Sequence, residues 1–137
     1  MDTLAVKNIL TSFHNIAVVG ISAKPERPSN RVAQYLIQQG YTVYPVNPGL
    51  QDVLGLPCYS SLSSIPPEVR KNIEIVNIFR KSEDVPPIVD EAIALGAKAI
   101  WMQLGISNDA AASKARNAGL QVIENQCIAV VHQQLFH

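Results

Sequence analysis

Residues 16–48 read IAVVGISAKPERPSNRVAQYLIQQGYTVYPVNP, and this stretch decides the fold. It opens with an unbroken apolar run, residues 16–21, which is typical of a strand that is covered on both faces in a parallel sheet. A loop with two prolines follows, and Ser29 or Asn30 is then expected to cap an amphipathic helix. A second apolar strand, residues 41–46, comes next. The stretch therefore predicts a strand–helix–strand unit.

The rest of the chain continues this alternation. We expect a helix over residues 2–13 and an irregular segment over residues 50–72. The later elements are predicted as a strand at 73–79, a helix at 86–95, a strand at 99–102, a helix at 108–118, a strand at 120–123 and a helix at 127–136. This order predicts an α/β fold, a Rossmann-like three-layer sandwich with a five-stranded, mainly parallel sheet. Residues 1–137 should form a single domain.

Composition excludes several classes of protein. The 137 residues are 47% hydrophobic and 16% charged, which is a globular composition. Eleven basic and eleven acidic residues cancel, and the lack of a basic excess disfavours a nucleic-acid partner. No apolar run approaches the ~18 residues that span a bilayer, and the N-terminus does not resemble a signal peptide. Two cysteines indicate neither a disulfide framework nor a metal site, so we expect a cytoplasmic protein.

Ligands of an open parallel sheet bind beyond the carboxyl ends of its strands, near the point where the strand order reverses. Four loops should meet there, residues 20–30, 46–49, 79–83 and 101–106, and residues 125–127 are a further candidate. This expectation follows from topology and does not depend on the ligand.

The first of these loops has the features of a phosphate cradle. Gly20 allows a close backbone approach, Ser22 offers a hydroxyl, and cations come from Lys24, Arg27 and Arg31. The free N–H groups and the dipole at the start of the following helix also favour anions. We therefore expect a phosphate-bearing ligand here, and Gly20→Val should block its pocket while leaving the fold mostly intact.

The loop lacks the sequence motifs of two classes of nucleotide-binding site, and this limits the type of nucleotide that we expect. A dinucleotide site would need G-x-G-x-x-G and an acid about 20 residues later, and a Walker loop has its own glycine pattern. Only Gly20 is present, and the second strand ends without a carboxylate. NAD is therefore disfavoured, as is ATP or GTP bound by a Walker loop. NADP remains an alternative, with Arg27 or Arg31 on its 2′-phosphate.

Five motifs between about Ile16 and His132 carry a resemblance: VVGISAKPERPSNR, YPVNP, IVNIFRKSED, WMQLGI and ENQCIAVVH. Together they resemble the small stand-alone CoA-binding proteins, which are relatives of the CoA-binding domain of the succinyl-CoA synthetase alpha subunit. The resemblance implies a five-stranded Rossmann-like fold with coenzyme A across the strand ends.

The resemblance also implies which residues meet the ligand. The nucleotide end and its phosphates would contact Gly20, Ile21, Ser22, Ala23, Lys24, Arg27 and Ser29. The adenine and ribose would contact Val46, Asn47 and Pro48. Phe79 and Arg80 would line the pocket, and Met102, Gln103 and Leu104 would face the pantetheine arm.

We therefore expect non-catalytic binding of coenzyme A or an acyl-CoA, with regulation through a protein partner as an open role. No catalytic residue is predicted. The alternatives are an enzyme that acts on acyl-CoA, through Cys127 or Glu124, and an NADP-binding module. Cys127 could form a mixed disulfide with the CoA thiol, although an inert core cysteine is its default interpretation.

Overall fold

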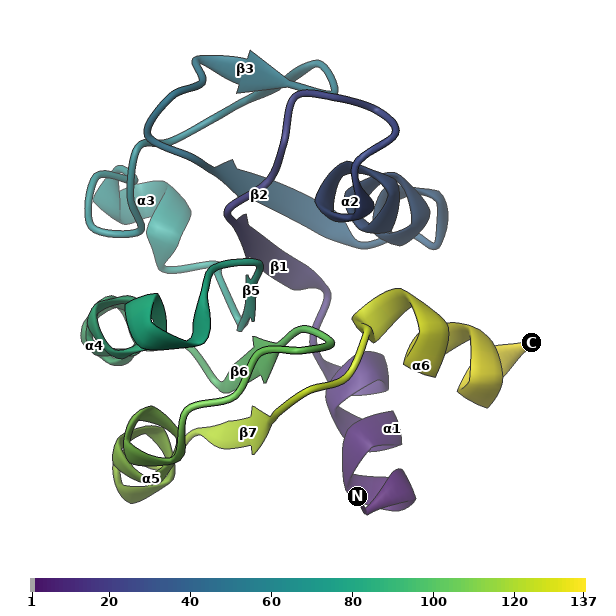
Figure 1. Cartoon of the computed structure of the whole chain (residues 1–137), viewed down its shortest axis with the longest axis vertical. Helices are drawn as coiled ribbons and strands as arrows, with labels where there is room; N and C mark the ends of the chain where they lie inside the picture. Colours follow the sequence, from purple (N-terminus) through teal and green to yellow (C-terminus); the bar gives the residue numbers. More distant parts are fainter. Residues whose placement is uncertain (1) are drawn as a thin grey trace.

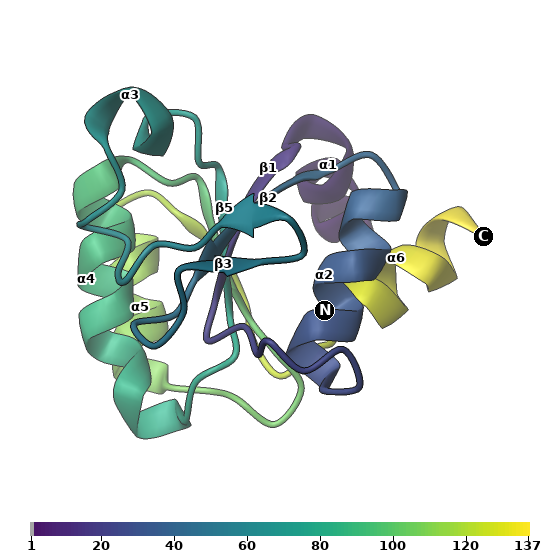
Figure 2. The same ribbon diagram turned by 90° about the horizontal axis from the view of Figure 1, so that it is seen from above.

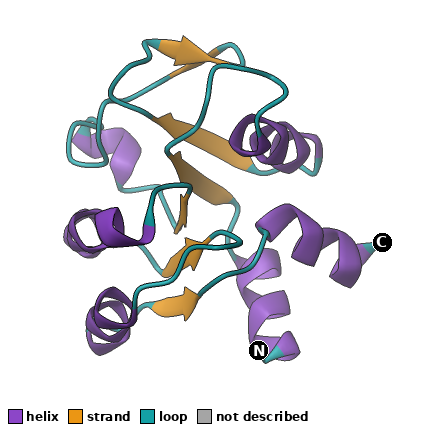
Figure 3. Ribbon diagram, in the orientation of Figure 1, coloured by secondary structure: helices purple, strands orange, loops and turns teal. Residues whose placement is uncertain are grey.

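A computed structural model describes residues 2–137 and shows a five-stranded sheet between two layers of helices (Figure 1). The strands of this sheet are β1 (Asn15–Val19), β2 (Thr42–Val46), β5 (Ile75–Ile78), β6 (Ala99–Met102) and β7 (Gln121–Ile123). The helices are α1 (Thr3–Ser12), α2 (Pro28–Gln38), α3 (Pro67–Arg70), α4 (Val85–Leu95), α5 (Asp109–Asn117) and α6 (Ile128–Phe136), with a 3-10 turn η1 (Ser82–Asp84) before α4. A separate hairpin, β3 (Asp52–Val53) and β4 (Leu56–Pro57), lies apart from the main sheet (Figure 3).

The five strands are parallel and lie in the order β2-β1-β5-β6-β7. The chain steps outward from β1 to β2 and then returns to the other side of β1 to form β5. In register, Ile16 of β1 lies opposite Val43 of β2 and Ile75 of β5. The predicted Rossmann-like fold is therefore confirmed, and the strand order reverses between β1 and β5.

Helices cover both faces of the sheet (Figure 2). α3, α4 and α5 lie against one face, and α1, α2 and α6 lie against the other. Ala17 and Val19 belong to the first of the two cores, whereas Ile16 and Val18 belong to the second. This division explains why β1 is apolar at successive positions instead of alternating with polar residues.

The start of α2 differs from the prediction. Arg27 occupies the cap position without a side-chain cap bond, and Pro28 is the first helical residue. The Ser29 Oγ instead accepts a hydrogen bond from the N–H of Ser22 at 2.9 Å, and Asn30 Nδ2 donates to the Ser22 carbonyl at 2.8 Å. Proline already suits the first helical position. Ser29 and Asn30 therefore brace the preceding loop and do not cap the helix.

Residues 50–72 are more ordered than the sequence indicated, since they hold the hairpin and α3. Leu54 and Gly55, at the hairpin turn, have φ values of 55° and 74°. A leucine in the left-handed region is unusual. The sequence Leu54-Gly55 therefore does not predict a hairpin turn, as Asn-Gly at the same place would have done. Tyr59 then forms an isolated parallel bridge with Val46, which places the following residues beside β2.

Gly20 follows β1 and is held by both neighbouring strands. Its N–H donates to the Val46 carbonyl at 2.8 Å, and its φ is +91°. A Cβ on Gly20 would lie 2.4 Å from the carbonyl oxygen of Phe79 and 2.9 Å from Cδ of Arg80. The close approach that requires glycine is thus made by the segment after β5, not by a ligand. The expectation that Gly20→Val would leave the fold mostly intact is wrong.

Gly20→Ala should destabilise the protein more than Gly40→Ala. The two glycines have φ values of +91° and +96°, so both substitutions carry backbone strain of about 1–3 kcal/mol. Only at Gly20 would the new Cβ also meet a backbone carbonyl, since nothing lies within 4 Å of that position at Gly40. In chemical denaturation we expect Gly20→Ala to lose a further ~1–3 kcal/mol of unfolding free energy. Equal losses would contradict the clash.

α6 packs on α2 through a buried histidine. His132 is 7% exposed, and its Nδ1 lies 2.7 Å from the hydroxyl of Tyr35. Its ring also packs edge-on against Tyr41, whose hydroxyl donates to the Leu10 carbonyl of α1 at 2.6 Å. Burial, and secondly the charge of His137, lowers the pKa of His132 below its usual range.

Acid should therefore destabilise the packing of α6. As the pH falls, His132 is protonated in the unfolded chain at a higher pH than in the folded protein. The free energy of unfolding therefore falls as the pH drops through about 6.5, the ordinary histidine pKa. We expect urea unfolding at a series of pH values from about 8 to 5 to show this loss. His132→Asn keeps an acceptor for Tyr35 and should flatten the profile. An unchanged profile would exclude His132 as the titrating group.

Candidate functional site

Three cavities meet at the carboxyl ends of the strands. The cradle cavity, about 360 Å³, lies at the loop between β1 and α2. The apolar cavity, about 430 Å³, shares Pro28 and Phe79 with it. The inner cavity, about 130 Å³, shares Gly20 with the cradle cavity and Arg80 with the apolar cavity. Because they share these residues, the three cavities adjoin one another at the predicted switch point, and together they are called the groove below.

The cradle cavity is the polar part of the groove. Its walls include Ser22, Lys24, Arg27 and Ser29. The Ser22 Oγ accepts a hydrogen bond from the Lys24 N–H at 3.1 Å, which fixes the turn of the loop. Lys24 and Arg27 are exposed, and the three ion pairs found among residues 2–137 involve other cations. Two cations without acidic partners at the start of a helix are suited to a phosphate.

The inner cavity lies between the turn after β2 and the segment that follows Tyr59. Val46 and Pro48 line it, together with Ser60, Ser61 and Leu62. Sequence reasoning missed this last segment, because only the bridge from Tyr59 to Val46 brings it beside β2. Asn47 fixes the turn from outside the cavity.

Asn47 connects the first two loops of the groove. Its Nδ2 donates to the Ile21 carbonyl at 2.7 Å, and its Oδ1 accepts a hydrogen bond from the Gly49 N–H at 2.8 Å. The side chain therefore holds the turn after β2 against the loop after β1. It contributes to the groove by positioning its walls.

The apolar cavity has walls from several elements, and Val32, Ile106 and the 71% exposed Leu104 are among them. Gln103 also lines it but is only 4% exposed. Its Oε1 accepts hydrogen bonds from Asn77 Nδ2 and from the N–H of Ile128, both at 2.9 Å. Gln103 thus connects β5, β6 and α6. Val32 was not predicted, and Ile106 was predicted only as part of the loop 101–106, because an apolar residue on a helix or in a loop has no signal that separates pocket from core.

Most of the predicted contact residues line this groove, but several do not. Met102 and Ile21 have no exposed surface, and Ala23 lines none of the three cavities. The Met102 side chain belongs to the core under α4 and α5. The expected contact between this side chain and a pantetheine arm therefore does not fit the structure. Arg31 is exposed on α2 and is also absent from the three linings.

Arg80 lies at the junction of the groove. Its Nη2 is 3.6 Å from Oδ2 of Asp84, and both side chains are more than two-fifths exposed to solvent. Such an exposed pair is weak. The guanidinium is therefore able to exchange Asp84 for an anionic ligand at little cost.

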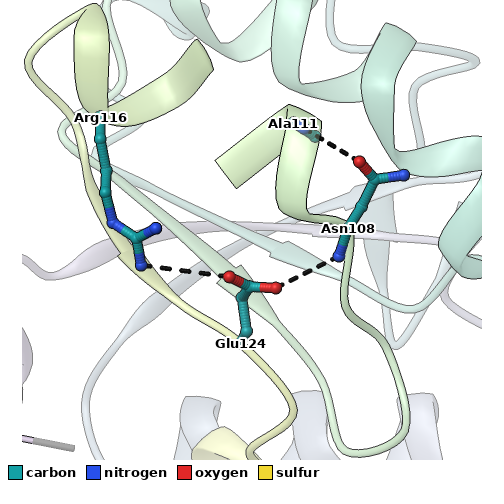
Figure 4. Close-up of polar contacts among 4 residues, drawn as sticks. All are labelled: Asn108, Ala111, Arg116 and Glu124. Carbon is teal, nitrogen blue, oxygen red and sulfur yellow. Dashed lines mark hydrogen bonds and ion pairs between the residues drawn. The ribbon is translucent and has the colours of Figure 1, made fainter. Parts of the chain in front are cut away.

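Glu124 serves a structural purpose away from the groove (Figure 4). Its Oε2 accepts a hydrogen bond from the Asn108 N–H at 3.2 Å, and its Oε1 lies 4.0 Å from Nη2 of Arg116. Asn108 in turn caps α5 by accepting from the Ala111 N–H at 2.9 Å. Glu124 lines a different cavity, between α1 and β7. The alternative of catalysis through Glu124 therefore has no support at the groove.

Other kinds of site are not found in the described part of the chain. Within residues 2–137, no three histidine, cysteine or acidic side chains gather as metal ligands. No helix in the same range has the length and apolar character to cross a membrane. Cys127 is half-buried and lines the apolar cavity.

Known proteins resemble this chain in sequence and in fold. Residues 14–133 match the CoA binding domain family. YneT of Bacillus subtilis (strain 168), described as uncharacterized, is 38% identical over 127 residues, which cover 93% of this chain and 91% of YneT. The structure of a hypothetical protein from Pyrococcus horikoshii OT3 superposes with a TM-score of 0.93 at 41% identity, covering 100% of this chain and 94% of that one.

A longer protein also matches. The ADP-forming acetate–CoA ligase I of Archaeoglobus fulgidus is 25% identical over 130 residues, which cover 88% of this chain but only 18% of the ligase. The similarity is therefore to one segment of that enzyme. With the match to residues 14–133 and the full-length similarity to YneT, the chain belongs to the CoA binding domain family.

Proposed function

We propose that this protein binds coenzyme A, free or as an acyl-CoA, in the groove and without catalysis. The observation that carries the proposal is that a cavity with two cations that form no ion pair within residues 2–137 adjoins, at Pro28 and Phe79, a cavity with largely apolar walls. CoA combines an anionic nucleotide with a long, uncharged arm. Membership of the family supports a CoA-related role.

The ligand would lie along the groove with its phosphates in the cradle cavity. There Arg27 and Lys24 supply positive charge and Ser22 supplies a hydroxyl group. The adenosine would lie toward Val46 and Pro48, and the arm would pass Phe79 into the apolar cavity. Every contact is with a residue that lines one of the three cavities.

The NADP alternative has less support from the geometry. Arg31, one of the two arginines that could hold a 2′-phosphate, does not line the groove. A nicotinamide ribose also needs polar partners, whereas Val32, Leu104 and Ile106 make the cavity next to the cradle largely apolar, and its polar residues are Arg80, Lys81 and Gln103.

Isothermal titration should show saturable binding of CoA and much weaker binding of NAD, NADP and ATP. A thermal-shift series provides a second readout, because a ligand at about 100 times its Kd adds about 2.7 kcal/mol to the stability of the folded state. Acetyl-CoA belongs in the same series to compare free and acylated ligand. Absence of binding at millimolar CoA would exclude the proposed function.

Arg27→Ala should weaken CoA binding by about 1.5–3 kcal/mol, because it removes a charge-assisted contact to a phosphate. Arg31→Ala is the matched control: it removes the same charge from an exposed position outside the groove and should change the affinity little. Titrating both variants with CoA and with dephospho-CoA tests which phosphate is held. A smaller loss with dephospho-CoA assigns Arg27 to the 3′-phosphate, and equal losses for Arg27→Ala and Arg31→Ala would show that the cradle is misplaced.

A further inference from the structure

Cys127 lies in the apolar cavity, at the residue that immediately precedes α6. We propose that Cys127 is a covalent capture site, which takes the thiol end of a CoA disulfide by thiol–disulfide exchange. This inference rests on the proposed function, since it requires the arm of CoA to enter the apolar cavity. The side chain is half-buried and so keeps access to a ligand.

The dimensions of the sheet place Cys127 within reach of the arm. The cradle follows β1, whereas Cys127 lies over the ends of β6 and β7, because the N–H of its neighbour Gln126 donates to the Met102 carbonyl at 3.3 Å. Two to three strand spacings therefore separate the cradle from Cys127, and at about 4.8 Å for each spacing this separation is about 10–14 Å. The pantetheine arm is a chain of methylene and amide groups about as long as four extended residues, roughly 14 Å. A phosphate in the cradle therefore allows the sulfur of the ligand to arrive near Cys127.

A second side chain in the same cavity indicates a ligand with a carbonyl group. Gln103 is 4% exposed, and its Oε1 is engaged by donors from Asn77 and Ile128. Among residues 2–137 the Nε2 of Gln103 has no acceptor. This nitrogen differs from Asn77 Oδ1, which is the fully buried side-chain atom without a partner in the same range, because Gln103 Nε2 is not fully buried. Because Gln103 lines the apolar cavity, its N–H groups are available there to an amide carbonyl of the arm.

The exchange needs no oxidant besides the disulfide itself. The sulfur of Cys127 attacks one sulfur of the CoA disulfide, a new S–S bond forms to that half, and the original S–S bond breaks. The second CoA leaves as a thiolate and takes up the proton that Cys127 has lost. One disulfide is consumed and one is formed, so the electrons balance.

Cys58 provides an internal control. It is also half-buried, but its Sγ donates to the Asn47 carbonyl at 3.7 Å, and it lines none of the three cavities. Burial raises the pKa of the Cys58 thiol, so little reactive thiolate is present. Cys58→Ser and Cys127→Ser are matched single substitutions.

The test treats the reduced protein with CoA disulfide and, separately, with glutathione disulfide, and follows adducts by intact mass and peptide mapping. Binding of the nucleotide raises the effective concentration of the reacting sulfur. We expect an adduct at Cys127 that forms at least tenfold faster with CoA disulfide, and that excess acetyl-CoA slows. Cys58→Ser should retain the adduct and Cys127→Ser should abolish it.

Equal rates with both disulfides, an adduct at Cys58, or no adduct with CoA disulfide would each overturn the capture site. Calorimetry of Cys127→Ser with reduced CoA separates this result from failure of the proposed function. If that variant binds CoA while the unaltered protein forms no adduct, the capture site alone is wrong. If neither protein binds CoA, the proposed function fails as well.

Discussion

The groove depends on how tightly three strands are joined where β1 ends. The Gly20 N–H donates to Val46 of β2, and the Phe79 N–H donates to Val19 of β1, both at 2.8 Å. Between these bonds the Phe79 carbonyl lies so close to Gly20 that no side chain fits. This contact joins the ends of β1 and β5, and Gly20, Phe79 and Arg80, which form it, are residues that the three cavities share. A ligand in the groove would therefore lie against the backbone of Gly20 and Phe79, which also joins the ends of the strands.

Amide side chains, of which Asn30 and Gln103 are buried, then fix the loops that the strands leave free. Asn30 holds the cradle loop, Asn47 connects it to the turn after β2, and Gln103 connects β6 to α6. Asn125, with φ of 57°, accepts a hydrogen bond from the Gly105 N–H at 2.6 Å and so ties the last two loops together. Amides make these connections, and in the part of the chain that the structure describes Lys24 and Arg27 form no ion pair. The amides thus hold the walls of the groove in place, and the cations of the cradle stay available for a ligand.

Much of this architecture could be predicted from the sequence, because burial of both faces requires β6, and β1 after Asn15, to be apolar. The convergence of the loops followed from the same topology. The predictions that failed concern contacts with residues that are distant in the sequence. Nothing local reveals that the Phe79 carbonyl fills the space at Gly20, or that Tyr59 bridges to Val46. Met102 was placed by resemblance at the groove, whereas the pleat of β6 turns its side chain into the core.

The two ends of the groove differ in a way that selects among nucleotides. A dinucleotide carries a polar ribose on each side of its phosphates, and both ends then need hydrogen-bonding partners. Here the cradle has Lys24 and Arg27. The cavity beyond Phe79 has largely apolar walls, and its polar groups are Arg80 and Lys81 beside Phe79, the Gln103 amide and the Cys127 thiol. Placing a ribose there would cost the desolvation of its hydroxyl groups. A pantetheine arm has two amides and one hydroxyl among its methylene groups and ends in a sulfur, so it has fewer hydroxyl groups to desolvate than a ribose, and the asymmetry of the groove fits the proposed ligand, coenzyme A.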